Sequence, residues 1–515
     1  MSIFSNKSKK TAAIVSYISL IVSTLSSMFL TKIILFSLGE NGYGLYQMIY
    51  SLASNLMVLD LGIGTVMIRY ISEYHTKMDY KRESNFAAMM GIISIACSII
   101  ITMLCFFMAN YIGNIYPKLS HEEVITSRIM IYFMSIQFIF NIIGNYTSGY
   151  IQAYERFLYV SIRGIVNTII TFILTVLFLK LNFGCVGIVI ANLLVIIIIC
   201  VCDLIVLKRI LNVKVKLYKW DNVIIRPAIG LMIAMFLQSI IGYINSSADK
   251  TILGIMCNKS DVTIYSIAAT IITMFNTVPC VLSGFFQPQV TQMITRGESR
   301  NKLGDLVARV GRIQFMLCMA ILGAFFLFGK DFLQLWVGEN IAPHAWIIVM
   351  IIMPVNMVPL VQTICLSILN GYNKRLYRSI ILIGMTFVNV LLTVILINYI
   401  GAIGAPIATA ISYLIGHVIL LNIYYNKVIK LDIIGIFKCI LKKSWICSIL
   451  AIIISYPLTM WKEVSIISFI IKCSLFCIWY FALLYIYGLN RSERNLCAFY
   501  FNKVLNIFKI QNKFK

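Results

Sequence analysis

Charged side chains inside long apolar stretches are the residues of this sequence most able to do chemistry. Lys32 is the first of them, because it stands more than twenty residues into an uncharged run that begins after Lys10. The nearest acidic residue in the sequence is Glu40. A charge in the middle of a membrane-spanning helix costs roughly 2.5–3.5 kcal/mol on insertion scales, so such a residue is a functional candidate by default. Two interpretations of Lys32 stay open: its ammonium group reaches the lipid headgroups, or it faces a cavity.

A second candidate site lies further along the chain and consists of four residues. Gln238, Gly242, Asn245 and Asp249 follow one another at i, i+4, i+7 and i+11, which places them on one face of a helix. Lys250 lies about 100° further round the same helix and borders this face. The face is either part of a water-filled cavity or a seam of interhelical hydrogen bonds.

Asp60 and Arg69 complete the set of candidates. Asp60 stands among leucine and isoleucine residues, where it either pairs with a cation, for example Arg69, or takes up a coupling proton. Arg69 ends the same apolar run, a position typical of an ordinary positive charge at the cytoplasmic border.

The sequence contains no cluster that predicts catalysis or metal binding. Its four histidines are dispersed, and its 14 cysteines are scattered mostly through apolar stretches. Cys200 with Cys202 and Cys473 with Cys477 are the close pairs, and neither has a histidine beside it. We interpret the cysteines as small core residues and expect no metal, no cofactor and no catalytic residue.

Composition shows which elements must position these residues. Hydrophobic residues make up 60% of the chain and charged residues only 12%. The apolar runs reach the roughly 20 residues that a helix needs to cross a bilayer, and they lack the alternation of strands. We predict fourteen spans: 11–38, 43–69, 86–112, 126–151, 157–180, 184–206, 223–248, 263–287, 310–329, 345–370, 378–398, 402–424, 442–460 and 465–488.

The basic residues orient the chain in the membrane. If both termini are cytoplasmic, 34 of the 43 lysines and arginines fall at cytoplasmic segments and span ends. This bias accounts for most of the net charge of +24, so we expect no nucleic-acid partner. The basic tail is expected to lie against anionic membrane lipids. The first apolar segment is too long for a signal core and lacks a cleavage site, so we expect no cleavable signal peptide.

An internal repeat divides the chain. AYERFLYVSI (153–162) matches GYNKRLYRSI (371–380) at an offset of 218, and TKIIL (31–35) matches DKTIL (249–253) at the same offset. The second match sets Lys250 in the place of Lys32. Each copy holds six spans, and because six is even, both copies start on the same side of the membrane.

The predicted fold is therefore an all-α integral membrane protein with two parallel six-helix lobes. The lobes are 1–210 and 211–430, and two accessory helices with a basic cytoplasmic tail follow at 431–515. Parallel repeats around a cavity near the middle of the membrane are a transporter architecture.

Residues 38–74 resemble the N-terminal signature of the Wzx-like polysaccharide flippases. That family belongs to the multidrug/oligosaccharidyl-lipid/polysaccharide exporter superfamily. The matching positions are Leu38–Gly39, Tyr43–Gly44–Leu45–Tyr46, Asp60–Leu61–Gly62 and Arg69. ADKTILG (248–254) and IYSIA (264–268) resemble the start of that family's second lobe.

The resemblance implies a flippase that moves an undecaprenyl-pyrophosphate-linked oligosaccharide across the bacterial plasma membrane by alternating access. It also implies a coupling ion, proton or sodium, and a polysaccharide polymerase as partner. A pyrophosphate crossing the bilayer needs cations, and Lys32, Lys250 and Arg69 are the candidates. The lipid II flippase is a fourteen-helix cousin in this superfamily, whereas its multidrug exporters usually have twelve helices.

Three other functions are weighed against the flippase. A cation-coupled multidrug exporter would favour buried acids without lysines beside them. A membrane-integral polymerase or glycosyltransferase would need an outer loop or acid cluster for acid–base work. The predicted outer segments 113–125, 249–262 and 330–344 are short and lack such a cluster, so we do not expect an enzyme. A non-transporting scaffold would leave the polar face without a use.

Overall fold

The predicted all-α membrane fold is confirmed. The computed structural model describes residues 9–372, 374–461, 463–490 and 493–494, and none of these residues lies in a β-strand. Eleven stretches of this described part are long and apolar enough to cross a membrane. Two of them, Val15–Thr76 and Tyr377–Ile429, each contain two of the predicted spans. The predicted span 442–460 falls on a shorter helix and the 3₁₀ turn after it.

The chain forms two compact units. The first contains the residues up to 270 together with 382–409, and the second contains 271–381 together with the residues from 410 on. The helices follow one another along the chain as α1 (Lys9–Ser54), α2 (Ile63–Thr76), α3 (Tyr80–Ile115), α4 (His121–Ala153), α5 (Phe157–Lys180), α6 (Gly184–Ile205), α7 (Asn222–Met256), α8 (Lys259–Thr295), α9 (Arg300–Val337), α10 (Ala342–Val361), α11 (Thr363–Gly371), α12 (Arg375–Ile400), α13 (Gly404–Tyr413), α14 (Leu421–Tyr424), α15 (Ile433–Leu441), α16 (Ser444–Ser455) and α17 (Ile466–Leu483).

The predicted lobe boundaries fall where the chain leaves the helical conformation. Residues 212–221 between α6 and α7 are not helical, and neither are residues 430–432 before α15. The compact units group helices by contact and the predicted lobes group them by sequence repeat, so the lobes stay a prediction.

Left-handed backbone conformations divide the first long apolar stretch at two places. Gly39, with a φ of 70°, breaks α1 between the first two predicted spans. After the 3₁₀ turn Asn55–Asp60, Leu61 and Gly62 have φ of 53° and 65°. A Cβ on Gly62 would lie 2.5 Å from the Cβ of Met235, so the backbone conformation and the approach of α7 both require glycine here.

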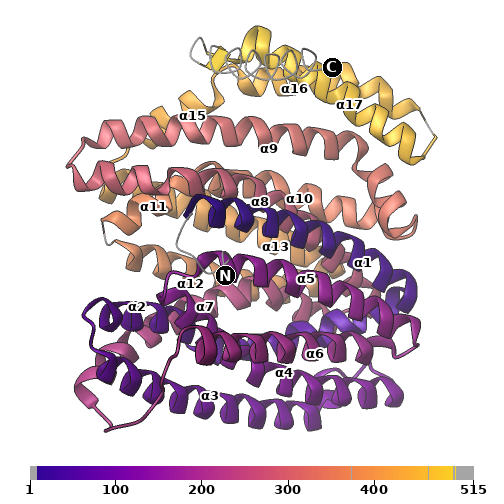
Figure 1. The fold of residues 1–515 in the computed structure, drawn as a ribbon. Coiled ribbons are helices and arrows are strands. Elements are labelled where there is room, and N and C mark those ends of the chain that lie inside the picture. The colour runs from indigo at the N-terminus through magenta and orange to yellow at the C-terminus, as the bar shows by residue number, and fades with distance from the viewer. Residues whose placement is uncertain (1–8, 373, 462, 491–492, 495–515) are drawn as a thin grey trace, which may run out of the picture. The chain divides into compact units, whose positions relative to one another are not determined.

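In the first unit, long helices pack side by side. The pairs α3 with α4, α4 with α6, α5 with α6 and α1 with α5 are in contact, and Figure 1 shows these helices running beside one another. Small residues permit close approach, as is common between membrane helices. A Cβ on Gly149 of α4 would lie 2.6 Å from the carbonyl oxygen of Gly64 in α2. Helices α2 and α4 are therefore tightly packed at this position.

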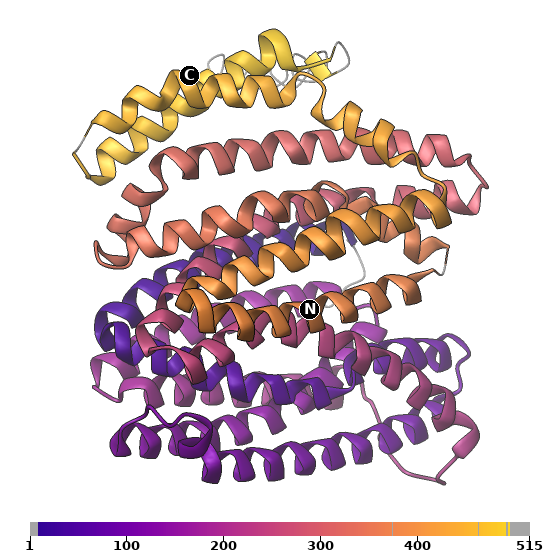
Figure 2. The ribbon, with the colours of Figure 1, turned by 180° about the vertical axis from the view of Figure 1, so that it is seen from behind.

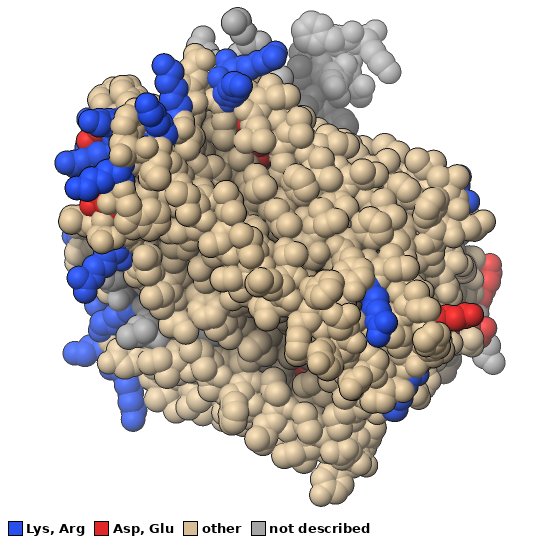
Figure 3. Space-filling model, turned by 90° about the horizontal axis from the view of Figure 1, so that it is seen from below, with Lys and Arg blue, Asp and Glu red and all other residues tan. Residues whose placement is uncertain are grey.

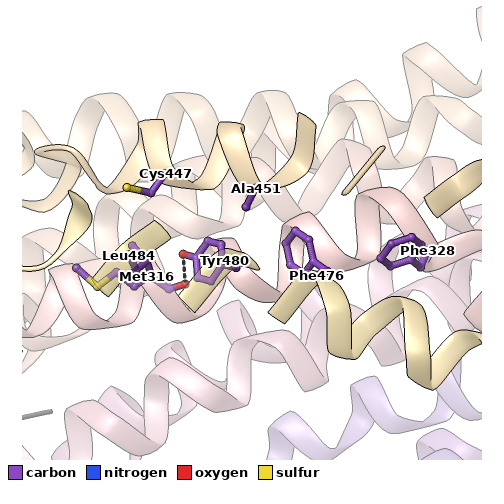
Figure 4. Packing of buried hydrophobic residues seen from close by; sticks show 7 residues of the cluster. All are labelled: Met316, Phe328, Cys447, Ala451, Phe476, Tyr480 and Leu484. Atoms are coloured by element: carbon purple, nitrogen blue, oxygen red, sulfur yellow. Dashed lines mark hydrogen bonds between the residues drawn. The ribbon is translucent and has the colours of Figure 1, made fainter. Parts of the chain in front are cut away.

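In the second unit, the accessory helices α16 and α17 pack on α9. Figure 2 shows both lying along α9. The packed residues include Phe476 and Tyr480 of α17, both fully buried against Phe328 of α9 and Ala451 of α16 (Figure 4). The Tyr480 hydroxyl donates a hydrogen bond of 2.7 Å to the carbonyl oxygen of Met316. The accessory pair is thus joined to α9 by a continuous core.

A buried arginine joins α9 to further parts of the second unit. Arg312 of α9 is 1% exposed. One of its terminal nitrogens donates to the carbonyl oxygens of Cys439 and Lys442 at 2.8 and 3.0 Å, and the other donates to that of Gly488 at 2.5 Å. Its Nε lies 2.9 Å from a carboxylate oxygen of Glu493. A single side chain therefore connects α9 to the ends of α15 and α17 and to the start of the tail.

The charged side chains gather away from the broad apolar surface. Figure 3 shows one face on which lysine and arginine collect along one edge, while the middle is almost free of charge. The hydrocarbon of a bilayer favours such an apolar band bordered by basic residues.

Candidate functional site

The polar face of α7 divides into an exposed part and an engaged part. Gln238 and Gly242 are exposed. Asn245 is half-buried and accepts a hydrogen bond of 3.0 Å from the Thr386 hydroxyl of α12, and Asp249 is 5% exposed. The end of the face that carries the carboxylate is thus an interhelical seam, one of the two interpretations that the sequence left open.

Asp249 is the centre of a hydroxyl-rich cluster within the first unit. Its carboxylate accepts hydrogen bonds from Tyr265 of α8, from Thr409 of α13 at 2.8 Å and from Thr393 of α12 at 3.3 Å. The Asn389 side-chain oxygen lies 3.3 Å from the Thr393 hydroxyl and 3.4 Å from that of Thr409. Within the described part of the chain, Asp249 forms no ion pair with a lysine or arginine. A buried carboxylate is thus stabilised by neutral donors alone.

Lys250 points to a different helix. Its Nζ donates to the Gln47 side-chain oxygen of α1 at 3.4 Å, and Gln47 in turn donates to the Tyr43 hydroxyl at 2.9 Å. The neighbouring Ser247 donates to Asn55, and the hydroxyls of Ser51 and Thr251 lie 3.4 Å apart. Helix α7 therefore carries one polar seam toward α12 and α13 and another toward α1.

Sequence reasoning missed the partners of α7, although one signal for them exists. Thr386, Asn389 and Thr393 are spaced i, i+3 and i+7, which places them on one face of α12. Like the polar face of α7, this is a row of polar side chains at helical spacing. Tyr265 and Asn55 show no such periodicity, so only the fold reveals them as partners of α7.

Asp60 lies at the break between the 3₁₀ turn and α2. Its Oδ1 is buried without a hydrogen-bond partner, and the Asn145 amide is its neighbour. Among the described residues, Asp60 forms no ion pair, so the expected pairing with Arg69 is not formed. Arg69 is exposed on α2, with its guanidinium carbon 5.7 Å from the centre of the Tyr70 ring. An incompletely satisfied carboxylate thus lies beside the end of a discontinuous helix.

Lys32 is half-buried on α1. Its Nζ lies 5.8 Å from the centre of the Phe36 ring, and Phe36 is 68% exposed. This position fits an ammonium group directed along the outer surface of the helix as well as one directed to a cavity. The two interpretations of Lys32 remain open.

Two further buried carboxylates were not predicted as site residues. Glu83 is 3% exposed and accepts hydrogen bonds from Tyr150 and Tyr154 at 2.7 and 2.6 Å. Burial and the neighbouring Glu83 carboxylate raise the pKa of Tyr154, so its hydroxyl stays a donor. Asp203, which is fully buried, lies 3.0 Å from Arg163 and accepts a hydrogen bond of 2.9 Å from Tyr159.

A group of contacts fastens the α7–α8 turn to neighbouring turns of the first unit. Lys259 forms an ion pair with Glu123, and Lys118 donates to the carbonyl oxygens of Met256 and Cys257 at 2.7 and 3.1 Å. These residues lie at predicted outer segments. We call this group the outer clasp.

Metal-binding and disulfide sites are not formed by the residues that the structure describes. No three histidine, cysteine, aspartate or glutamate side chains lie together there as a metal site would require. The cysteines in the described part are free thiols.

Comparison with protein families identifies the chain. The model of the family described as polysaccharide biosynthesis protein matches residues 11–282, which is more than half of the sequence. The chain belongs to this family. A comparison with curated proteins finds no match.

Solved structures share the fold of this polysaccharide biosynthesis protein at low sequence identity. The lipid II flippase MurJ in an inward closed conformation is 14% identical, with a TM-score of 0.72, and the match covers 92% of this chain and 98% of that one. An inward-facing multidrug resistance MATE transporter is 16% identical, with a TM-score of 0.65, and the match covers 79% and 96%. A transporter from Pyrococcus furiosus, described as a member of the MOP superfamily, is 18% identical. Its TM-score is 0.57, and the match covers 79% of this chain and 92% of that one.

Proposed function

We propose that this protein is a flippase for a lipid-linked oligosaccharide carried on undecaprenyl pyrophosphate. Membership of the polysaccharide biosynthesis family supports a substrate from that process. The observation that carries the proposal is the fold match to the lipid II flippase, which extends over 92% of the chain. The match to the multidrug resistance MATE transporter extends over 79%, so it accounts for less of the molecule.

The proposed site of action is the bacterial plasma membrane, with both termini in the cytoplasm and a polysaccharide polymerase as the downstream partner. Transport of this kind requires no covalent step, so we propose that the protein is not an enzyme. Cations on α1 and α7, Lys32 and Lys250, would accompany the pyrophosphate, and Arg69 would meet it at entry.

Reconstituted vesicles offer the direct test. Purified protein is placed in vesicles whose inner leaflet holds a fluorescent lipid-linked oligosaccharide, and an added sugar-specific quencher reports material that reaches the outer leaflet. We expect the protein to accelerate this appearance. Unchanged kinetics, together with export of small amphipathic cations by the same vesicles, would favour the multidrug function instead.

The lysines are tested in the same vesicles. We expect Lys32→Ala combined with Lys250→Ala to slow flipping at normal protein level, because the pyrophosphate loses both cations. Lys302→Ala, an exposed lysine of α9 near the predicted cytoplasmic side, serves as the control. Full activity of the double variant would remove both residues from the mechanism.

We further propose that Asp249 takes up the coupling ion, proton or sodium. The support is a buried carboxylate without a cationic partner in the described chain, surrounded by the hydroxyl oxygens of Thr393 and Thr409. Either a proton or a hard cation with oxygen ligands would neutralise it there.

The ion proposal predicts a specific loss. Asp249→Asn should retain slow downhill flipping but lose its acceleration by an imposed sodium or proton gradient. The asparagine amide is neutral, so it neither takes up a proton nor supplies the negative charge that attracts sodium. The control is Asp305→Asn, an exposed carboxylate of α9. Equal acceleration of wild type and Asp249→Asn by both gradients would contradict the assignment.

A further inference from the structure

A groove of about 600 Å³ lies in the second unit, away from all the site residues described above. It is bounded by α9, α10, the π-helical stretch Leu414–Leu420 and α15. Its walls are almost wholly apolar, with Phe315, Met357, Val361 and Val418 among the residues that line it. An apolar groove of this size accommodates a hydrocarbon chain but offers few partners to a sugar or another polar ligand.

The polar groups at the groove are few, and the amide among them is already bonded. Asn422 is the amide that lines the groove. Its side-chain oxygen accepts from Gln362 at 2.7 Å, and its nitrogen donates to the carbonyl oxygen of Val418 at 2.8 Å. Recognition inside the groove is therefore left to apolar contact.

Helix α15 is apolar on two sides. Ile436 and Ile440 are buried and face α9, where a Cβ on Gly311 would lie 2.8 Å from the Cδ1 of Ile440. Ile434, Phe437 and Leu441 line the groove together with Ile440, and Ile434 is 63% exposed. A short helix with this pattern is typical of the membrane interface, where its open apolar side contacts lipid.

The charge at the groove has one sign. Lys438 is the charged side chain that lines it, and it is exposed. The acidic residue nearby, Asp432, is engaged at the start of α15, where its carboxylate accepts from the Gly435 amide at 2.9 Å. Four further exposed lysines flank the groove residues in the chain: Lys427, Lys430, Lys442 and Lys443. Basic pockets between membrane helices on the cytoplasmic side bind anionic lipid headgroups.

We propose that the groove is a binding site for one anionic phospholipid of the bilayer. One acyl chain lies between α15 and α10, and the phosphate lies against Lys438. The bound lipid packs against the open side of α15, the helix that links the twelfth predicted span to the accessory pair. Phospholipid is also the lipid in greatest supply around the protein, so mass action favours it over a scarcer polyprenyl lipid.

The test measures bound lipid and does not depend on the transport activity. Full-length protein purified in detergent is mixed with equal amounts of phosphatidylglycerol and phosphatidylcholine, and native mass spectrometry counts the retained lipid. We expect preferential retention of phosphatidylglycerol by wild type. Lys438→Gln should reduce that preference about fivefold, the factor of one lysine at an anionic membrane surface. Lys302→Gln, an exposed lysine of α9 that neither lines the groove nor flanks its residues in the chain, should leave it unchanged.

A second variant tests the groove itself. Val418→Phe fills the space with a ring, and we expect it to lower retention of both phospholipids while the protein keeps its melting temperature in lipid-free detergent. Equal retention of the two phospholipids by wild type would overturn the proposal. So would an unchanged preference in Lys438→Gln, or displacement of phosphatidylglycerol by equimolar undecaprenyl phosphate.

Discussion

Arg312 shows how much a single buried charge can organise at the residue scale. Its guanidinium is 1% exposed and bonded to three carbonyl oxygens and to Glu493. A buried charge is tolerated when hydrogen bonds and an opposite charge compensate it. Here both terminal nitrogens donate to carbonyl oxygens, and the Nε lies 2.9 Å from the Glu493 carboxylate. The residue therefore acts as a structural clamp.

The clamp leads to a stability prediction. Arg312→Met should lower the free energy of unfolding by roughly 3 kcal/mol, because it leaves buried carbonyl oxygens and Glu493 without a partner. The measurement is the midpoint of thermal unfolding in detergent. Arg309→Met, three residues earlier on α9 and exposed, should have a small effect. Equal midpoints for the two variants would contradict the clamp.

The residue scale also shows where sequence reasoning stops. The spacing of Asn245 and Asp249 was enough to identify a polar face. It could not identify Tyr265, Thr393 and Thr409 as the donors, because these residues come from three other helices. Nor could it identify Arg312 as buried, since burial is a property of packing and not of spacing.

At the scale of the element, the broken second span is the most informative feature. The apolar run 43–69 predicts one continuous helix, but the structure interrupts it at Leu61 and Gly62. Broken helices in membranes occur where protein or a cavity satisfies the freed backbone groups. Hydrophobicity is continuous through the break, so an apolar pattern alone could not reveal it.

The break predicts a strict requirement for glycine. Gly62→Ala should destabilise the protein by more than about 1–2 kcal/mol, because the left-handed backbone disfavours a Cβ and Met235 occupies its space. Gly230→Ala is the matched control on α7, where an added Cβ meets open space within a helix. It should be neutral or slightly stabilising.

Both variants are compared by thermal unfolding and by flipping in vesicles. A Gly62→Ala protein as stable and active as Gly230→Ala would show that the break is not required.

At the scale of the whole molecule, the apolar blocks and their count gave the all-α membrane fold. The contacts between distant helices did not follow from the repeat: residues 382–409 of α12 and α13, for example, belong with α7 to the first compact unit. Contacts such as Asp249 with Thr393 join segments 144 residues apart. Sequence periodicity shows which face of each helix is polar or apolar, but it does not show which distant helix packs against that face.

The outer clasp predicts a block of the transport cycle. The α7–α8 turn must leave its neighbours if the predicted lobes move apart there during transport. A short, reducible cross-linker that joins Glu123→Cys to Lys259→Cys should then stop flipping. Reduction of the cross-link should restore it. Both cysteine pairs are introduced into a variant from which the native exposed cysteines have been removed. The control joins Ser16→Cys to Ser161→Cys, whose native hydroxyls lie 2.6 Å apart within the predicted first lobe. Undiminished flipping by the cross-linked clasp would exclude its opening from the cycle.

The Arg312 contacts also set an order of events during synthesis. The carbonyl of Gly488 is made 176 residues after Arg312. At 5–20 residues per second, the ribosome needs roughly 9–35 s to supply it. During that interval α9 is inserted with a guanidinium whose final partners do not yet exist. Biogenesis of this protein therefore includes a waiting period in which water, lipid phosphates or an insertion chaperone must shelter that charge until residues made long after α9 surround it.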